Sequence, residues 1–180
     1  MICVSGYVGG AFLGLTLLER EKRIFLENPQ IQPDLEGEDY IVGRLLKPEA
    51  RKDIIQFFEQ NNIVPTSMMD VSDGVSSEVL HLCTQSSTGC RLYEEKLPIN
   101  ELARAAAYKF GLDPTVCALN GGEDYELIFT LKQSDYDKIT LNEEISVIGY
   151  MTPPEEGKKI ITKGGNTFDI TAQGWNAFKE

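Results

Sequence analysis

Residues 120–131 read Asn120-Gly121-Gly122-Glu123-Asp124-Tyr125-Glu126-Leu127-Ile128-Phe129-Thr130-Leu131, and this stretch gives the clearest fold signal in the chain. The paired glycines permit a sharp turn. After the turn the side chains alternate, with Tyr125, Leu127, Phe129 and Leu131 on one side and Glu126, Ile128 and Thr130 on the other. A period of two predicts a strand, here one with a single strongly apolar face.

The other elements are predicted by working outward from this strand. Further strands are expected at 2–4, 67–69, 89–93 and 145–150, and a terminal hairpin at 158–162 and 167–170. Helices are expected at 9–22, 48–61, 75–85, 100–110 and 134–141, with a loop over 28–39. Strands and helices interleave without strict βαβ regularity. The expected fold class is therefore α/β or α+β, layered, with a mixed sheet and packed helices.

Composition and charge restrict the function classes. The chain has 180 residues, 42% of them hydrophobic, which suits one compact domain. It carries 28 Asp and Glu against 17 Lys and Arg, a formal net charge of -11, and no long basic stretch. Nucleic acid is therefore not an expected partner. Such acidity also repels phosphorylated metabolites unless divalent cations neutralise part of the site, so metal-dependent phosphate chemistry is compatible with it.

The cysteines indicate a reducing compartment. Cys3, Cys83, Cys90 and Cys117 form no C-x-x-C pair, and the single histidine, His81, offers no partner for a zinc cluster. They are expected to be buried, reduced thiols. No secretory signal pattern opens the chain, and no apolar run reaches the length of a membrane helix, about 18 residues. A cytoplasmic protein without a membrane partner is expected.

The segment Asp70-Val71-Ser72-Asp73-Gly74 is the first candidate site, because it places two carboxylates and a hydroxyl on a strand-to-helix turn. Backbone N–H groups at a helix N-terminus favour an anion. Carboxylates beside them suit Mg²⁺, which shares its remaining positions with water and substrate phosphates. The alternative is structural: Ser72 or Asp73 caps the helix and Asp70 is simply solvated.

A second candidate is the acidic turn at Gly121-Gly122-Glu123-Asp124, whose alternative interpretation is a polar hairpin connection. The glycines at 6, 9, 10 and 14 match no nucleotide-binding motif, and close helix packing is the favoured explanation for them. Trp175, the only tryptophan, could stack on a planar ligand or anchor its own tail. No Ser/His/Asp or Cys/His catalytic grouping is apparent, so no catalytic residue is assigned.

Four stretches together resemble the thiamine-monophosphate kinases of the aminoimidazole ribonucleotide synthetase-like superfamily. They are Met68-Met69-Asp70-Val71-Ser72-Asp73-Gly74, Glu94-Glu95-Lys96-Leu97-Pro98-Ile99, Gly121-Gly122-Glu123-Asp124-Tyr125-Glu126-Leu127 and Gly174-Trp175-Asn176-Ala177-Phe178. The resemblance implies that Asp70 and Asp73 contact Mg²⁺ and that Ser72 touches an ATP phosphate. It further implies that Glu123 and Trp175 line the thiamine monophosphate pocket.

The resemblance also implies the protein's organisation and reaction. Residues 1–180 would form the single C-terminal domain of a two-domain kinase, without the N-terminal domain that supplies further ATP and metal ligands and that pairs with its copy in a homodimer. The reaction would be Mg²⁺-dependent transfer of the γ-phosphoryl of ATP to thiamine monophosphate, and the fragment alone is expected to be inactive. The alternatives are another ATP-dependent enzyme of the superfamily, such as selenophosphate synthetase or the hydrogenase-maturation protein, and a non-catalytic binding or assembly module.

Overall fold

The computed structural model describes residues 1–172, with seven strands and seven α-helices in that part of the chain. The strands are β1 (Ile2–Ser5), β2 (Ser67–Asp70), β3 (Gly89–Tyr93), β4 (Leu127–Thr130), β5 (Ile145–Thr152), β6 (Lys158–Ile161) and β7 (Thr167–Asp169). The helices are α1 (Gly10–Glu27), α2 (Asp39–Leu46), α3 (Lys52–Gln60), α4 (Val75–Ser86), α5 (Glu101–Lys109), α6 (Pro114–Asn120) and α7 (Tyr136–Ile139). Short 3₁₀ turns lie at Glu94–Lys96, Gln133–Asp135 and Pro154–Glu156.

All seven strands belong to one sheet, in the order β2-β4-β1-β5-β3-β6-β7. Every neighbouring pair is antiparallel except β3 and β6, which are parallel, so the sheet is mixed as predicted. The strand that dominates the sequence signal, β4, lies between β2 and β1, with Phe129 opposite both Met68 and Cys3. This position, one strand in from the β2 edge of the sheet, fixes where the loop before β4 emerges.

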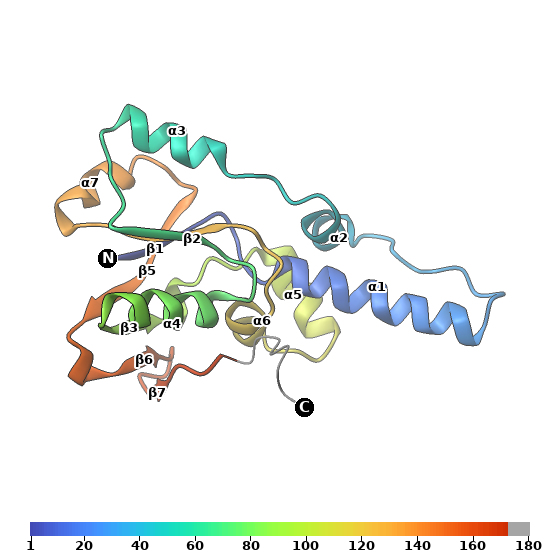
Figure 1. Cartoon of the computed structure of the whole chain (residues 1–180). Helices are drawn as coiled ribbons and strands as arrows, with labels where there is room; N and C mark the ends of the chain where they lie inside the picture. Colours follow the sequence, from blue (N-terminus) through green and yellow to red (C-terminus); the bar gives the residue numbers. More distant parts are fainter. Residues whose placement is uncertain (173–180) are drawn as a thin grey trace.

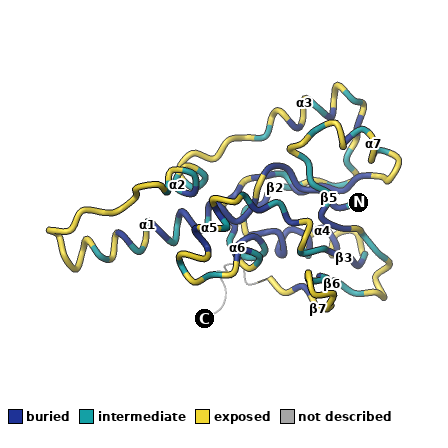
Figure 2. Tube along the Cα trace, turned by 180° about the vertical axis from the view of Figure 1, so that it is seen from behind, coloured by how far each residue is buried: buried dark blue, intermediate teal, exposed yellow. Residues whose placement is uncertain are grey.

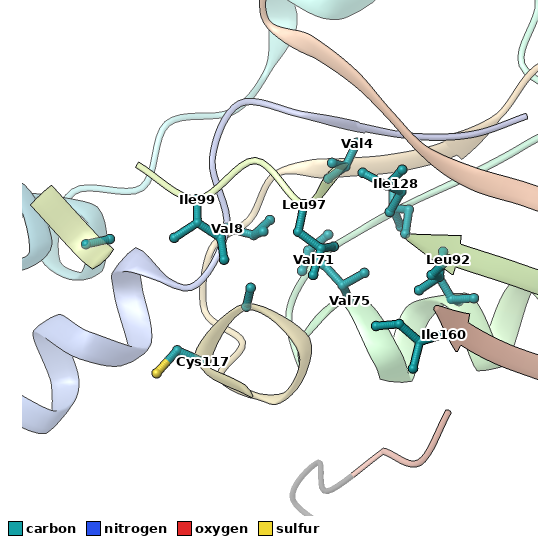
Figure 3. Close-up of a cluster of buried hydrophobic side chains, with 14 of the residues drawn as sticks. Val4, Val8, Val71, Val75, Leu92, Leu97, Ile99, Cys117, Ile128 and Ile160 are labelled. Atoms are coloured by element: carbon teal, nitrogen blue, oxygen red, sulfur yellow. The ribbon is translucent and has the colours of Figure 1, made fainter. Parts of the chain in front are cut away.

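Helices cover both faces of the sheet (Figure 1). On one face α3 and α7 bury a small core in which the Phe58 ring meets the Phe129 ring edge-on at 5.0 Å between centroids. On the other face α1, α4, α5 and α6 bury the larger core, which Figure 3 shows around Val4, Val71 and Ile128. Figure 2 shows that the sheet interior is buried, whereas the outer end of α1 is exposed.

The expectation of one apolar face on β4 is wrong, because both faces are buried. Ile128 belongs to the larger core and Phe129 to the smaller one, and each has no exposed surface. Tyr125, placed on the apolar face by the alternation, is 41% exposed, whereas Glu126 is 2% exposed. A strand covered by helices on both sides has no polar face. The strand itself begins only at Leu127, so Tyr125 and Glu126 precede it.

Two helices, α2 and α6, were not predicted as separate elements. For α6 the sequence did contain a start signal: Pro114 occupies the first turn, and the Asp113 carboxylate accepts a hydrogen bond from the Thr115 N–H at 2.7 Å. The four cysteines are free and buried, as expected. Among the described residues, no helix is long and apolar enough to cross a bilayer.

The glycine at position 14 serves helix packing, as the sequence favoured. A Cβ added to Gly14 would collide with the Ile41 carbonyl oxygen of α2, so the missing side chain lets the two helices approach closely. Gly43, on α2 itself, has nothing within 4 Å of such a Cβ. Gly14 and Gly43 therefore have opposite packing environments.

We expect Gly14→Ala to lower the free energy of unfolding by about 1–3 kcal/mol, because the α2 backbone must move away. Gly43→Ala is the matched control, and we expect it to raise stability by up to about 1 kcal/mol, since alanine favours a helix interior. Urea unfolding of both variants measures the difference. Equal effects of the two substitutions would contradict the assigned contact.

Candidate functional site

The two motifs singled out in the sequence lie side by side at one end of the sheet. Strand β2 ends at Asp70, which is paired with Leu127, the first residue of β4. Beyond this pair the two connections continue the pairing: Val71 N–H donates to the Glu126 carbonyl at 2.7 Å, and Tyr125 N–H donates to the Val71 carbonyl at 2.9 Å. A third bond, from Glu123 N–H to the Ser72 carbonyl at 2.8 Å, joins the candidate segments themselves.

Glycines make this close approach possible. A Cβ on Gly122, whose φ is +69°, would overlap the Ser72 carbonyl oxygen. A Cβ on Gly74, whose φ is +113°, would come within 2.7 Å of the Leu119 carbonyl oxygen. Both glycines therefore combine a conformation that side chains disfavour with a contact that has no room for one. The segments at 70–74 and 120–126 pack backbone against backbone.

The residues of the second segment alternate between solvent and interior. Glu123 and Tyr125 are exposed and both adopt positive φ, +62° and +51°, whereas Asp124 and Glu126 are each 2% exposed. Positive φ costs a residue with a side chain free energy, and such strain persists where the surroundings impose it. Here the two buried carboxylates impose it, because each is held by several partners below the surface.

Asp124 ties the segment to the N-terminus of α1. Its carboxylate accepts hydrogen bonds from Gly9 N–H at 2.6 Å and Ala11 N–H at 3.2 Å. Burial raises the pKa of Asp124 to about 6, against the lowering effect of these two N–H donors and of the Arg44 charge. This buried carboxylate, rather than a phosphate, thus occupies the glycine-rich helix start.

Glu126 ties the same segment to β1 and to the chain that enters α3. It accepts a hydrogen bond from the Ser5 hydroxyl at 2.6 Å and forms ion pairs with Arg51 at 2.5 Å and Arg44 at 3.0 Å. Ser5 in turn accepts the Leu127 N–H at 2.8 Å. Buried charges that are fully paired in this way hold their backbone in one conformation.

The exposed side chains gather on one surface. The Tyr125 hydroxyl donates to a Glu123 carboxylate oxygen at 3.0 Å. The Glu123 carboxylate raises the pKa of Tyr125 above its usual range through this bond and its charge, and the nearby charges of Asp70 and Asp73 add to the effect. The phenol thus stands close to three carboxylates. Four of the five predicted site residues, Asp70, Ser72, Asp73 and Glu123, lie on the two joined segments, and Trp175 lies outside the described residues.

The helix-cap and hairpin alternatives are wrong, whereas Asp70 is exposed, as its solvated alternative expected. The N-cap residue of α4 is Gly74, and there is no side-chain cap hydrogen bond at this helix start. Neither Ser72 nor Asp73 therefore caps that helix. The segment at 120–126 joins α6 to β4 and is therefore not a hairpin connection. The anion expectation also needs a correction, because the N–H groups of Ser72 and Asp73 donate to the buried Glu78 carboxylate at 3.1 and 2.8 Å.

The donor set suits a hard divalent cation held jointly with a ligand. Asp70 and Asp73 are exposed, and no ion pair among residues 1–172 involves either. No group of three or more Asp, Glu, His or Cys side chains in that same part of the chain could enclose an ion. Magnesium is commonly held by one or two carboxylates plus water and phosphate oxygens, and two exposed aspartates fit that pattern.

A cleft of about 520 Å³ opens beside Glu126, lined by Tyr40, Arg44, Lys47 and Arg51 among others. Its arginines already face carboxylates: Arg51 pairs with Asp53, Glu126 and Glu144. None of the four described candidate residues lines it. We therefore place the candidate site at the two joined segments, where unpaired acids and strained backbone coincide, rather than in the larger hollow.

Known proteins were compared with the chain in sequence and in structure. No family model matches. Thiamine-monophosphate kinase from Aquifex aeolicus is 29% identical over 177 residues, covering 98% of this chain and 51% of its own length. The thiamine-monophosphate kinase from Bacillus subtilis is 28% identical over 187 residues. The match covers 99% of this chain and 53% of that enzyme's length. A solved structure of AaThiL complexed with AMPPCP and TMP superimposes with a TM-score of 0.75 and 28% identity, covering 98% and 50%.

The chain is similar to thiamine-monophosphate kinases over nearly its whole length, in sequence and in fold. It spans about half the length of the curated relatives that it matches. The hydrogenase maturation protein HypE of Escherichia coli shares the fold, with a TM-score of 0.67 at 16% identity. The predicted resemblance to these kinases and the predicted layered fold of the aminoimidazole ribonucleotide synthetase-like proteins are therefore both confirmed.

The buried Asp124 predicts a pH dependence of stability in this kinase relative. Because its folded pKa of about 6 lies above the ordinary 3.8, the folded state keeps its proton longer than the unfolded state. Its contribution to stability is full below pH 4 and is lost as the pH rises through about 6, by roughly 3 kcal/mol at most. Urea unfolding at several pH values should show the unaltered chain losing stability relative to Asp124→Asn over this range. A pH-independent difference would contradict the burial of an ionisable group here.

Proposed function

We propose that this chain is the C-terminal domain of a two-domain, cytoplasmic, homodimeric kinase that converts ATP and thiamine monophosphate to ADP and thiamine diphosphate. The observation that carries the proposal is the hydrogen-bonded meeting of segments 70–74 and 120–126, which gathers Asp70, Ser72, Asp73 and Glu123 on one surface. The kinship with thiamine-monophosphate kinases, one of them solved with AMPPCP, an ATP analogue, and TMP, supports it.

In the proposed reaction an oxygen of the thiamine monophosphate phosphate attacks the γ-phosphorus of ATP. A new P–O–P linkage forms, the bond to the β-phosphate oxygen breaks, and ADP leaves. Both reactants are anions, so the site must align them and reduce their repulsion, and no covalent nucleophile is needed. Magnesium supplies the positive charge that screens the phosphates.

Each residue has a role in this scheme. Asp70 and Asp73 would hold Mg²⁺, which would supply positive charge beside the phosphates. The Ser72 hydroxyl would donate to a nucleotide phosphate oxygen. Glu123, with one oxygen engaged by the Tyr125 hydroxyl, keeps its second oxygen for a donor on thiamine monophosphate. Trp175 would stack on the planar cationic rings.

An incomplete site is expected of a chain half as long as its relatives. Two exposed carboxylates cannot by themselves fix two phosphate-bearing, anionic reactants in line, so the remaining ligands would come from the N-terminal domain. Isothermal titration tests the half-site directly: thiamine monophosphate with Mg²⁺ should bind this chain, and thiamine, which lacks the phosphate, should bind more weakly. Asp70→Asn with Asp73→Asn should abolish the Mg²⁺-dependent part of the binding.

We also expect no steady production of thiamine diphosphate from Mg²⁺ and ATP by this chain alone. A coupled assay for ADP together with chromatography of the thiamine phosphates measures it. Turnover would contradict the assignment of a half-site. Neither turnover nor binding of thiamine monophosphate would favour the alternative of a non-catalytic assembly module.

Trp175 gives a separate prediction. Trp175→Ala should weaken thiamine monophosphate binding by on the order of 1–2 kcal/mol, the range of a stacking and cation–π contact, and Trp175→Phe should recover part of the loss. The melting temperature should change little. A large fall in melting temperature with an equal loss of nucleotide binding would instead identify Trp175 as an anchor of its own segment.

A further inference from the structure

Glu78 lies on the first turn of α4, beneath segment 70–74, and is 1% exposed. Its Oε1 accepts hydrogen bonds from Asp73 N–H at 2.8 Å and Ser72 N–H at 3.1 Å, and a longer one from the Ser72 hydroxyl at 3.5 Å. One carboxylate oxygen thus fixes the two consecutive peptide groups that carry a proposed phosphate contact and a proposed metal ligand. The bonds are charge-assisted and lie out of water, where they are strongest.

These bonds serve the loop rather than the helix end. In a capping box, an acid in the first turn reaches back to the N-cap N–H. Glu78 reaches past the N-cap, Gly74, to the two residues before it. Gly74 itself has a φ of +113° and leaves no room for a side chain. The backbone that carries the Ser72 and Asp73 side chains is therefore held by Glu78 on one side. On the other side it is held by the hydrogen bond from Glu123 N–H to the Ser72 carbonyl.

The second carboxyl oxygen of Glu78 shows that stability alone does not explain this residue. Oε2 is buried and has no hydrogen-bond partner within the described part of the chain. An unsatisfied buried polar atom costs stability that an apolar side chain of the same shape would not. Residues that violate folding rules in this way concentrate where function needs them.

We infer that Glu78 is a positioning residue of the proposed site, holding the Ser72 hydroxyl and the Asp73 carboxylate in the orientation that meets Glu123. The inference rests on the proposed function for the roles of Ser72 and Asp73. The hydrogen bonds from their backbone N–H groups to Glu78 do not depend on that function. The inference predicts that removing Glu78 loosens segment 70–74 locally and weakens the cation site without a matching loss elsewhere. Glu78 itself touches neither cation nor substrate.

The test uses the ¹⁵N-labelled chain with Mn²⁺ as the probe. Hydrogen exchange of the Ser72 and Asp73 amides reports the strength of their hydrogen bonds to Glu78. Paramagnetic broadening of the Glu123 amide reports Mn²⁺ affinity. Glu78→Ala should accelerate both exchange rates and weaken Mn²⁺ binding, each about tenfold, the equivalent of one lost charge-assisted bond. Glu78→Gln keeps an acceptor oxygen and should stay within about threefold of the unaltered chain in exchange.

The matched control is Glu21→Ala. Glu21 is also buried, at 5% exposure, and also accepts a backbone N–H, that of Asp34 at 3.0 Å, but on the outer half of α1. Its loss should lower the melting temperature and leave both readouts unchanged. Should Glu78→Ala not fold, Glu78→Asp, one methylene too short to reach both amides, replaces it with the same expected result.

Unchanged exchange and Mn²⁺ affinity in the Glu78 variants would overturn the inference, as would equal changes in the Glu21 control. A different pattern separates the proposed function from the inference. The unaltered chain and Asp73→Asn could bind Mn²⁺ alike while Glu78→Ala still accelerates exchange of the Ser72 and Asp73 amides. That result would contradict a metal-binding role of Asp73 and would support the fixing of the two amides by Glu78.

Discussion

The hydrogen bond from Glu123 N–H to the Ser72 carbonyl, 2.8 Å long, is the contact on which the candidate site depends. It joins two segments that are about 50 residues apart in the chain and extends the β2–β4 pairing beyond the end of the sheet. The contact exists only because Gly122 has no side chain to strike that carbonyl. Without it the aspartates of one segment and the glutamate of the other would have no fixed relation.

Three buried carboxylates hold this junction from below. Glu78 binds the first segment, Asp124 binds the second to α1, and Glu126 binds it to two arginines. The exposed acids, by contrast, are unpaired with cations and face solvent next to Tyr125. The segments thus separate acids that hold the backbone from acids that are free for ligands. Free carboxylates near the proposed phosphate site would be useful only with a cation, which agrees with the proposed Mg²⁺ dependence.

The sequence predicted the elements with strong periodicity, and its candidates Asp70, Ser72, Asp73 and Glu123 lie on the two joined segments, but it did not predict the burial of the acids beside them. Strand β3 was placed at its observed bounds and the stripe of α4 at Val75, Val79 and Leu82 is buried. Alternation placed Tyr125 on the apolar face and Glu126 on the other, whereas Tyr125 is exposed and Glu126 is buried. Alternation does not reveal a positive φ or helices on both faces of the sheet. Glu78 was missed, although an acid three residues after Val75, within that apolar stripe, is a visible signal. Long-range partners such as Arg51 for Glu126 require the fold.

The account's central claim is that ligands meet the chain at the two joined segments and not in the larger cleft beside α2. Amide chemical shifts of the ¹⁵N-labelled chain, recorded while thiamine monophosphate and Mg²⁺ are added, test it most directly. We predict shifts in residues 70–74 and 121–126, with Lys47 and Ala50 of the cleft unaffected. Shifts confined to the cleft residues, with none at Ser72 or Glu123, would contradict the account.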